Sequence, residues 1–438
     1  LIGQIRELEK DRTDFLKFFI KNVVENQEVD LRAYKVNQQS IFLEEKIRYN
    51  VSEKILKNVS ILASDAGVAS SKYLGFEFSL ISVALTHFEY KNDQMTEVVY
   101  YPDQEDGSYG IVFNGSHRSD SDIEIFTSLE RSYAEISSII AFLRKYPDKK
   151  VHLIILDGSL RIELYKDSFK ENRKYLIKYT EVLNLYETLY SICQRRKILL
   201  IGSVKNTESV EFRENLNRAF PTYIQLFPTL TVFHKIRYRD LFEDFNDSYF
   251  LYRILDLNQR SCVYRLNSRI TDSGIIPGVT PSKPPSLLQN QRQYLCFYLQ
   301  VTPYEAPLKL EFLYDLGLFD GIERVKGLSE SQKVSTIADQ ISSLILPLSN
   351  KFGVSSLPIP QIEAHNRATF TLNEFGLLEE EVKNKYLIEL MQRFSQEEEN
   401  TGNKQNNIED LQKFIDMKKE HVKEFMGVFI ERRKSTPL

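Results

Sequence analysis

The stretch VHLIILDGSL, residues 151–160, decides the fold class of this 438-residue chain. Its four apolar residues 153–156 run directly into Asp157, and Gly158 then supplies a turn. A short apolar run that ends at a turn signal predicts a buried strand. The sequence therefore places a carboxylate at the carboxyl end of a core strand, and the question is what that carboxylate does there.

Helices and strands alternate around this strand. Residues 121–146 open with Ser and Asp, which suit a helix start, and then keep a helical spacing of apolar residues. A second helical stretch near 170–195 leads to the strand KILLIGSV at 197–204. This alternation predicts an α/β fold in which helices cover a sheet with parallel members.

Further strands are expected on either side of this unit. Upstream, VSILASDAG (59–67) is a short apolar run, and residues 76–88 are of types common in strands. EVVYY (97–101) and YGIVF (109–113) are separated by turn residues, which predicts a hairpin-like pair. Downstream, the pattern predicts strands at 294–301 and 308–313 and a helix near 329–348.

The two ends of the chain carry a different pattern. Residues 1–58 and 376–438 have apolar side chains at helical spacing among many charges, so we expect a helical N-terminal extension and a helical C-terminal region. Between them lies a central domain, residues 59–375. Within it, the Pro-, Gly- and Ser-rich tract 273–291 predicts an exposed loop or insertion.

The composition excludes several classes of protein. Because 57 basic residues face 61 acidic ones, the net charge is −4, and any surface that binds DNA must be local. Cys193, Cys262 and Cys296 fit neither a disulfide framework nor a zinc motif, which is typical of reduced thiols in the cytoplasm. No apolar run approaches the roughly 18 residues of a membrane span. The cysteines and the lack of such a run together predict a soluble cytoplasmic protein. No phosphate-binding Gly-x-x-x-x-Gly-Lys-Ser/Thr loop is present, so any ATP-driven motion must come from a partner.

Carboxylates gather where the predicted elements end. Asp65 ends the first core strand, Asp157 ends a later one, and the helix between them carries Glu130 and Glu135. Side chains at the carboxyl ends of strands in an open α/β sheet converge on one edge. Carboxylates there suit Mg²⁺ or Mn²⁺, and two such cations about 4 Å apart promote phosphodiester hydrolysis. The residues alone leave open the alternative of an ordinary Asp-Gly turn and solvated glutamates.

The order of these motifs resembles the NurA nuclease family. The matching pieces span roughly residues 58–375: an Asp-containing strand, a hairpin, a helix with R-x-x-A-E, LDGSL, GSVK and P-x-P-x-x-x-A-H. The resemblance implies a ribonuclease-H-like α/β fold, a mixed sheet flanked by helices, over the central domain. It also implies exonuclease or endonuclease action on DNA with Mn²⁺ or Mg²⁺. Finally, it implies a homodimer and a hexameric HerA-type ATPase as partner, in DNA end processing, repair or phage defence.

The same resemblance implies roles for individual residues. Asp65 in SDAG, Glu135 in RSYAE and Asp157 in LDGSL match the family's catalytic, metal-binding carboxylates, with Glu130 as the alternative to Glu135. His365 in IEAHNRATF matches the late catalytic histidine. A neutral imidazole there could ligand a metal or orient the leaving group.

A lysine and two departures complete the comparison with the family. Lys205, at the end of its predicted strand, matches a family lysine that could contact a DNA phosphate. Asp-Ala-Gly at 65–67 replaces the usual Asp-Gly-Ser, and Leu357 stands where the family tends to have a tyrosine. These departures support a second hypothesis, a non-catalytic adaptor that keeps the nuclease-like fold. Such an adaptor would dock on and regulate a HerA-type ATPase through its helical ends.

Overall fold

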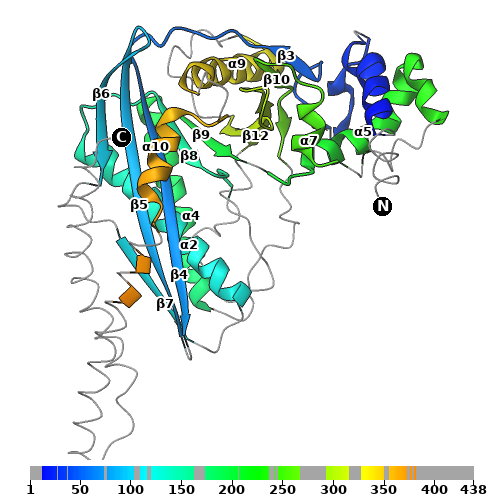
Figure 1. The fold of residues 1–438 in the computed structure, drawn as a ribbon. Helices are drawn as coiled ribbons and strands as arrows, with labels where there is room; N and C mark the ends of the chain where they lie inside the picture. Colours follow the sequence, from blue (N-terminus) through cyan, green and yellow to red (C-terminus); the bar gives the residue numbers. More distant parts are fainter. Residues whose placement is uncertain are drawn as a thin grey trace, which may run out of the picture.

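The computed structural model of the chain describes residues 12–371 with several gaps, together with residues 375–376 and 379–380. The gaps lie at residues 27, 37, 74–75, 103–108, 116–119, 162–172, 206, 236–241, 243–244, 267–292, 315–326 and 350–354. The predicted loop at 273–291 and nearly all of the predicted C-terminal region therefore lie outside the described residues. An 11-stranded mixed sheet forms the centre of the fold (Figure 1).

The middle of this sheet contains the strands on which the sequence analysis depends. Their order is β9 (Leu199–Val204), β8 (Leu153–Asp157), β4 (Val59–Tyr73) and β5 (Phe76–Lys91). β8 runs parallel to both β9 and β4, whereas β5 runs antiparallel to β4. The predicted α/β fold is confirmed, with the mixed sheet and flanking helices that the resemblance to a ribonuclease-H-like fold implies.

The outer edge of β5 carries two shorter strands. β6 (Gln94–Tyr101) pairs with residues 85–91 of β5, and β7 (Tyr109–Gly115) pairs with residues 76–82. The predicted pairing of these two strands as a hairpin is therefore wrong. The reason is the length of β5, whose 16 residues give each short strand its own stretch of the edge.

Beyond β9 the sheet continues with antiparallel strands. β13 (Leu308–Leu313) pairs with β9 and with β12 (Tyr294–Leu299). β12 in turn pairs with β10 (Gln259–Ser261) and β11 (Tyr264–Arg265), and β3 (Arg48–Asn50) closes this side through β10. The two strands predicted downstream, near 294–301 and 308–313, are confirmed.

The described part of the N-terminal region, from residue 12 onward, is less helical than the sequence predicts. Its elements before β3 are a helix at residues 12–19, η1 (Ile20–Val24), η2 (Leu31–Ala33), β1 (Lys35–Val36) and β2 (Gln39–Ser40). Phe19 and Phe42 are fully buried in the main core, and β3 belongs to the main sheet. Burial of these side chains and strand pairing join the described part of this region to the central fold.

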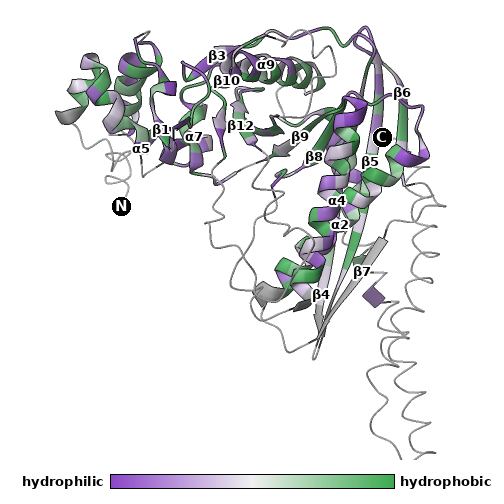
Figure 2. Cartoon of the chain, turned by 180° about the vertical axis from the view of Figure 1, so that it is seen from behind, coloured by the Kyte–Doolittle hydropathy of each residue, from purple (hydrophilic) through white to green (hydrophobic). Residues whose placement is uncertain are grey.

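Helices cover both faces of the sheet. α2 (Asp120–Lys145) and α4 (Arg173–Arg196) lie on one face, and α9 (Glu330–Leu348) and α10 (Ile359–Ala368) lie on the other (Figure 1). Seen from behind, α2 and α4 carry interleaved polar and apolar residues, as expected of helices with one face against a sheet (Figure 2).

Side chains of the central strands alternate between two apolar cores. Leu62 of β4 belongs to the core that contains Ile139 of α2, whereas its neighbour Ile61 belongs to the core that contains Ile341 of α9. All four side chains are fully buried. Because alternate residues of a strand point to opposite faces, the central strands are apolar along both faces, and their polar residues stand out.

The remaining helices lie at the N-terminal end of the molecule. They are α5 (Glu211–Leu226), the 3₁₀ segment η3 (Pro228–Lys235) and α7 (Asp247–Tyr252). Aromatic side chains such as Phe220 and Phe250 pack there against Phe19. Among the described residues, none of the helices combines the length and the apolar character that crossing a bilayer requires.

Candidate active site

Asp65 and Asp157 lie next to each other at the centre of the sheet. The parallel register of β4 and β8 pairs Ser64 with Leu156, so the next residue of each strand is one of the two aspartates. Asp65 is buried, with 3% of its side chain exposed, whereas 28% of the Asp157 side chain is exposed. The sequence analysis expected these carboxylates to converge, and the structure brings them together.

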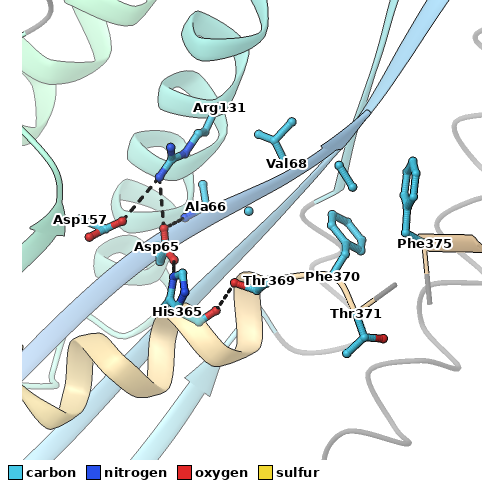
Figure 3. Close-up of a pocket in the computed structure, with 12 residues that line it drawn as sticks. Asp65, Ala66, Val68, Arg131, Asp157, His365, Thr369, Phe370, Thr371 and Phe375 are labelled. Atoms are coloured by element: carbon cyan, nitrogen blue, oxygen red, sulfur yellow. Dashed lines mark hydrogen bonds and ion pairs between the residues drawn. The ribbon is translucent and has the colours of Figure 1, made fainter. Parts of the chain in front are cut away.

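Two helices on opposite sides hold these carboxylates (Figure 3). Arg131 of α2 places Nη2 3.3 Å from Asp65 Oδ1 and 3.6 Å from Asp157 Oδ2. From α10, His365 Nδ1 lies 2.7 Å from Asp65 Oδ2, and the Gln361 side-chain amide donates to Asp157 Oδ1 at 2.8 Å. The predicted histidine is therefore beside the predicted aspartate, although 300 residues separate them in the sequence.

Glu135 occupies a deeper position one helical turn from Arg131. Its side chain is buried and accepts a 2.6 Å hydrogen bond from Ser64 Oγ. Burial raises the pKa of Glu135 to about 7, with the charges of Asp65 and Asp157 raising it and Ser64 and Arg131 opposing the rise. Glu135 therefore lies close enough to Asp65 and Asp157 for their charges to raise its pKa.

The alternative carboxylate on the same helix lies elsewhere. Glu130 forms a 3.1 Å ion pair with Lys178 of α4. It does not line the pocket that contains Asp65 and Asp157. Of the two glutamates, the structure therefore brings only Glu135 toward the aspartates.

A pocket of about 460 Å³ opens over the aspartates. One part of its wall is polar and is formed by Asp65, Asp157, Arg131 and His365. The other part contains apolar side chains, namely Val68, Ala69, Phe370 and Phe375. Figure 3 shows the rings of Phe370 and Phe375 beyond the end of α10, away from the carboxylates. The volume lies within the range of natural small-molecule sites.

Gly67 of the SDAG motif allows α10 to approach β4. A Cβ atom at Gly67 would overlap the carbonyl oxygen of Ala368, the last residue of α10. Relative to the family's Asp-Gly-Ser, the glycine thus stands two positions after Asp65 instead of one. This close approach of helix and strand places His365 over the carboxylates.

The turn after Asp157 is held by neighbouring strands. Gly158 has a positive φ of 113°, which favours glycine. A Cβ atom added at Gly202 would lie only 2.6 Å from the carbonyl oxygen of Gly158, so the close approach of β9 requires a glycine there. Glu311 of β13 accepts hydrogen bonds from Ser159 Oγ at 2.6 Å and from the Leu160 N–H at 3.0 Å. These contacts fix the backbone on which Asp157 stands.

Two other residues of the sequence analysis lie outside the pocket. Lys205 follows the end of β9 and is exposed, and it does not line the pocket. Leu357 is buried in the core beneath α9 and α10. At this position the chain uses its side chain for packing.

Sequence reasoning missed three residues of the site. Arg131 lies inside the RSYAE motif, and Gln361 lies at a variable position of P-x-P-x-x-x-A-H. Both contact Asp157, and neither was assigned a role. Glu311 had no sequence signal, because its contact with the LDGSL turn depends on strand pairing far along the chain.

The donor atoms at this site fit a hard divalent cation. Burial raises the pKa of Asp157, and the nearby charge of Asp65 raises it further, so the two carboxylates repel each other. A cation bound to their oxygens would relieve this repulsion, and carboxylate oxygens are ligands that Mg²⁺ and Mn²⁺ accept. Within the described residues, no three His, Cys, Asp or Glu side chains form a ready metal-binding group. Here Arg131 contacts both aspartates, and Glu135 is hydrogen-bonded to Ser64.

Comparison with solved structures finds nuclease structures at low sequence identity. The structure of the NurA nuclease from Sulfolobus solfataricus is 12% identical, with a TM-score of 0.48, and the match covers 89% of this chain and 97% of that one. A structure of NurA with manganese is 12% identical, with a TM-score of 0.35 and coverage of 86% and 96%. Endonuclease V from Bacillus subtilis is 10% identical, with a TM-score of 0.26 and coverage of 86% and 94%.

The family assignment depends on the sequence profile rather than on these structures. No curated protein matches the chain. The NurA domain profile matches residues 34–368, a range that begins within the N-terminal region and stops at the last residue of α10. Because this match covers well over half of the sequence, the chain belongs to the NurA family of nucleases.

Proposed function

We propose that the protein is a metal-dependent deoxyribonuclease that hydrolyses phosphodiester bonds in the pocket over Asp65 and Asp157. The observation that carries this proposal is the meeting of these two aspartates at adjacent parallel strands, with His365 bonded to Asp65 at 2.7 Å. Membership of the NurA family supports a nuclease.

Each residue of the site has a distinct role in this proposal. Asp65, Asp157 and Glu135 would hold Mn²⁺ or Mg²⁺. When bound, such a cation lowers the pKa of the attacking water and stabilises charge on the phosphate. His365, whose side chain is 59% exposed, is placed to contact the leaving group or the cation. Lys205 would contact a DNA phosphate outside the pocket.

The apolar part of the pocket supports an unpaired DNA strand as substrate. Phe370 and Phe375 are partly exposed and line the same pocket as the carboxylates. Bases of an unpaired strand can stack on such rings with little dependence on sequence, whereas bases in a duplex are already stacked. One solved NurA structure has dAMP and manganese bound.

The proposed partners follow from the family resemblance. We propose a homodimer that works with a hexameric HerA-type ATPase, in DNA end processing and repair or in phage defence. The protein would cleave DNA as an exonuclease, an endonuclease or both. The ATPase would supply the motion that moves DNA.

Asp157→Asn tests the catalytic proposal. The purified protein, alone and with its co-encoded ATPase, is incubated with linear single- and double-stranded DNA in Mn²⁺ or Mg²⁺. We expect Asp157→Asn to reduce cleavage at least about 1,000-fold, because it removes a charged ligand from the site. Asp148→Asn, an exposed residue in the turn after α2, makes the same charge change and should retain wild-type cleavage. Full activity of Asp157→Asn would contradict the proposal.

The adaptor hypothesis rests on two departures from the family pattern, Asp-Ala-Gly at 65–67 and Leu357. Calorimetry with Mn²⁺ separates the two hypotheses. The nuclease should bind Mn²⁺ in a way that Asp65→Asn and Asp157→Asn abolish, whereas an adaptor should show no binding that depends on these residues.

A further inference from the structure

All four carboxylate oxygens of Asp65 and Asp157 have protein partners, and Arg131 is the partner that the two residues share. Asp65 Oδ2 is bonded to His365, and Asp157 Oδ1 accepts from Gln361. The remaining oxygens, Asp65 Oδ1 and Asp157 Oδ2, both face Nη2 of Arg131. The arginine thus takes the bridging position between the carboxylates.

Arg131 holds this position loosely. Its contacts with the aspartates measure 3.3 and 3.6 Å, longer than the roughly 2.7–2.9 Å of a strong charge-assisted hydrogen bond. Its side chain is 37% exposed, against 3% for Asp65, and it lines the pocket. The guanidinium group can therefore leave the carboxylates without unpacking the core.

We propose that Arg131 is a built-in counter-cation, which competes with a divalent cation for Asp65 and Asp157 and is drawn away by the phosphate of the substrate. This inference rests on the proposed function and adds a form of regulation to the same site. The protein would load its cation weakly in the absence of a phosphate ligand and tightly in its presence.

Two physical arguments support this competition. A guanidinium and a divalent cation repel each other, so they cannot both lie in contact with the same pair of carboxylates without cost. Phosphate is the other group for which the planar guanidinium fork is well suited. Linkage then requires reciprocity: if phosphate strengthens cation binding, the cation strengthens phosphate binding by the same factor.

Isothermal titration calorimetry with Mn²⁺ tests the inference without any cleavage. Wild type, Arg131→Gln and Arg131→Lys are titrated with Mn²⁺ alone and then with saturating thymidine 5′-phosphate, which contains no phosphodiester bond. For wild type, we expect the nucleotide to tighten Mn²⁺ binding about fivefold or more. Arg131→Gln should bind Mn²⁺ about fivefold more tightly than wild type without nucleotide, and the nucleotide should then change its affinity less than about twofold.

Two further variants make the result specific. Arg144→Gln removes the same charge from an exposed position on the same helix, about 20 Å from Arg131 along the axis, and should match wild type. Arg131→Lys keeps the charge, so its Mn²⁺ affinity without nucleotide should stay close to that of wild type. Thermal unfolding of each variant with a chelator present shows that the protein is folded.

The outcomes separate this inference from the proposed function. Equal or weaker Mn²⁺ binding by folded Arg131→Gln overturns the competition, even if Asp157→Asn has lost DNA cleavage and the nuclease proposal stands. The same holds if Arg144→Gln tightens Mn²⁺ binding as much as Arg131→Gln does, because the effect would then be one of net charge. If wild type binds no Mn²⁺, both proposals fail.

Discussion

Two of the arginine–carboxylate clusters among the described residues use the same chemistry in opposite ways. In the closed cluster, Arg260 is 0% exposed and meets both oxygens of Glu44 at 2.7 and 2.8 Å, with Asp339 at 2.7 Å. In the open cluster, Arg131 meets Asp65 and Asp157 at 3.3 and 3.6 Å at the wall of a pocket. The short ion pairs of Arg260 are buried and join separate elements of the fold. The longer contacts of Arg131, shared between two aspartates, lie at a pocket where a ligand can compete for the carboxylates.

The largest expected effect comes from breaking the closed cluster. Arg260→Met leaves the Glu44 carboxylate, 1% exposed, without its bidentate partner. Removal of one partner of a buried pair typically lowers the free energy of unfolding by about 3–5 kcal/mol. Arg131→Met, at a partly exposed position, should lower it by about 1 kcal/mol or less.

Urea denaturation of both variants with a chelator present measures this difference. Glu44→Gln combined with Arg260→Met removes both charges and should recover part of the stability lost by Arg260→Met alone. Equal losses for Arg260→Met and Arg131→Met would show that the two clusters do not differ in the way that their geometry indicates.

A second prediction sharpens the comparison through pH. The pKa of Glu135 is raised from 4.5 to about 7 in the folded protein, mainly by burial. The folded state therefore binds the proton more tightly than the unfolded state. The stability from this proton is fully present below pH 4.5 and is lost as the pH rises through about 7. The loss for wild type should be about 3 kcal/mol.

The measurement is urea denaturation at pH 5 and pH 7.5 with a chelator present. Glu135→Gln should lose less stability over this range than wild type, because its amide cannot ionise. Glu130→Gln, on the same helix but paired with Lys178, is the matched control and should follow wild type. If Glu135→Gln shows the full pH dependence of wild type, burial does not hold a proton on Glu135.

The same contrast explains what the sequence could predict. Asp65 and Asp157 were found because each follows an apolar run, and neighbouring parallel strands bring such side chains together. Asp157 does end β8, but β4 continues past Asp65 to Tyr73, so the prediction that Asp65 ends its strand is wrong. The positions of β8 and β9 and of the helices around them followed from hydrophobic spacing. The pairing partners of β6 and β7 could not be predicted in this way. Turn residues between two strands indicate a hairpin, and they do not reveal that both strands pair with a longer third strand.

The helical contacts to the site were beyond sequence reasoning for a related reason. Arg131 and Gln361 reach the carboxylates only because α2 and α10 approach the strands from opposite faces, and Gly67 allows α10 to come close. A motif names residues along one chain segment and carries no information on this packing. His365 was identified only through the family resemblance, not through any local pattern.

The smallest expected effect concerns the apolar part of the pocket, which includes Phe370 and Phe375. The open cluster shares this pocket, whereas the closed cluster is buried. Phe370 lines the same pocket as Asp65, and it lies two residues past the range matched by the family profile. Replacement by Ala should weaken binding of single-stranded DNA about tenfold, since stacking of one base is worth about 1–3 kcal/mol. Fluorescence anisotropy of a labelled oligonucleotide, measured with Asp157→Asn as background so that no DNA is cleaved, gives the affinity.

Two comparisons make this prediction specific to the pocket. Tyr304→Ala removes a ring that is 79% exposed and does not line the pocket, and it should leave DNA affinity unchanged. Phe370→Tyr keeps a stacking surface and should bind nearly as well as the parent. If Phe370→Ala binds as tightly as Tyr304→Ala, the aromatic wall contributes no base contact. Recognition would then depend on phosphate contacts alone. In that case the affinity for DNA should fall steeply as salt is added.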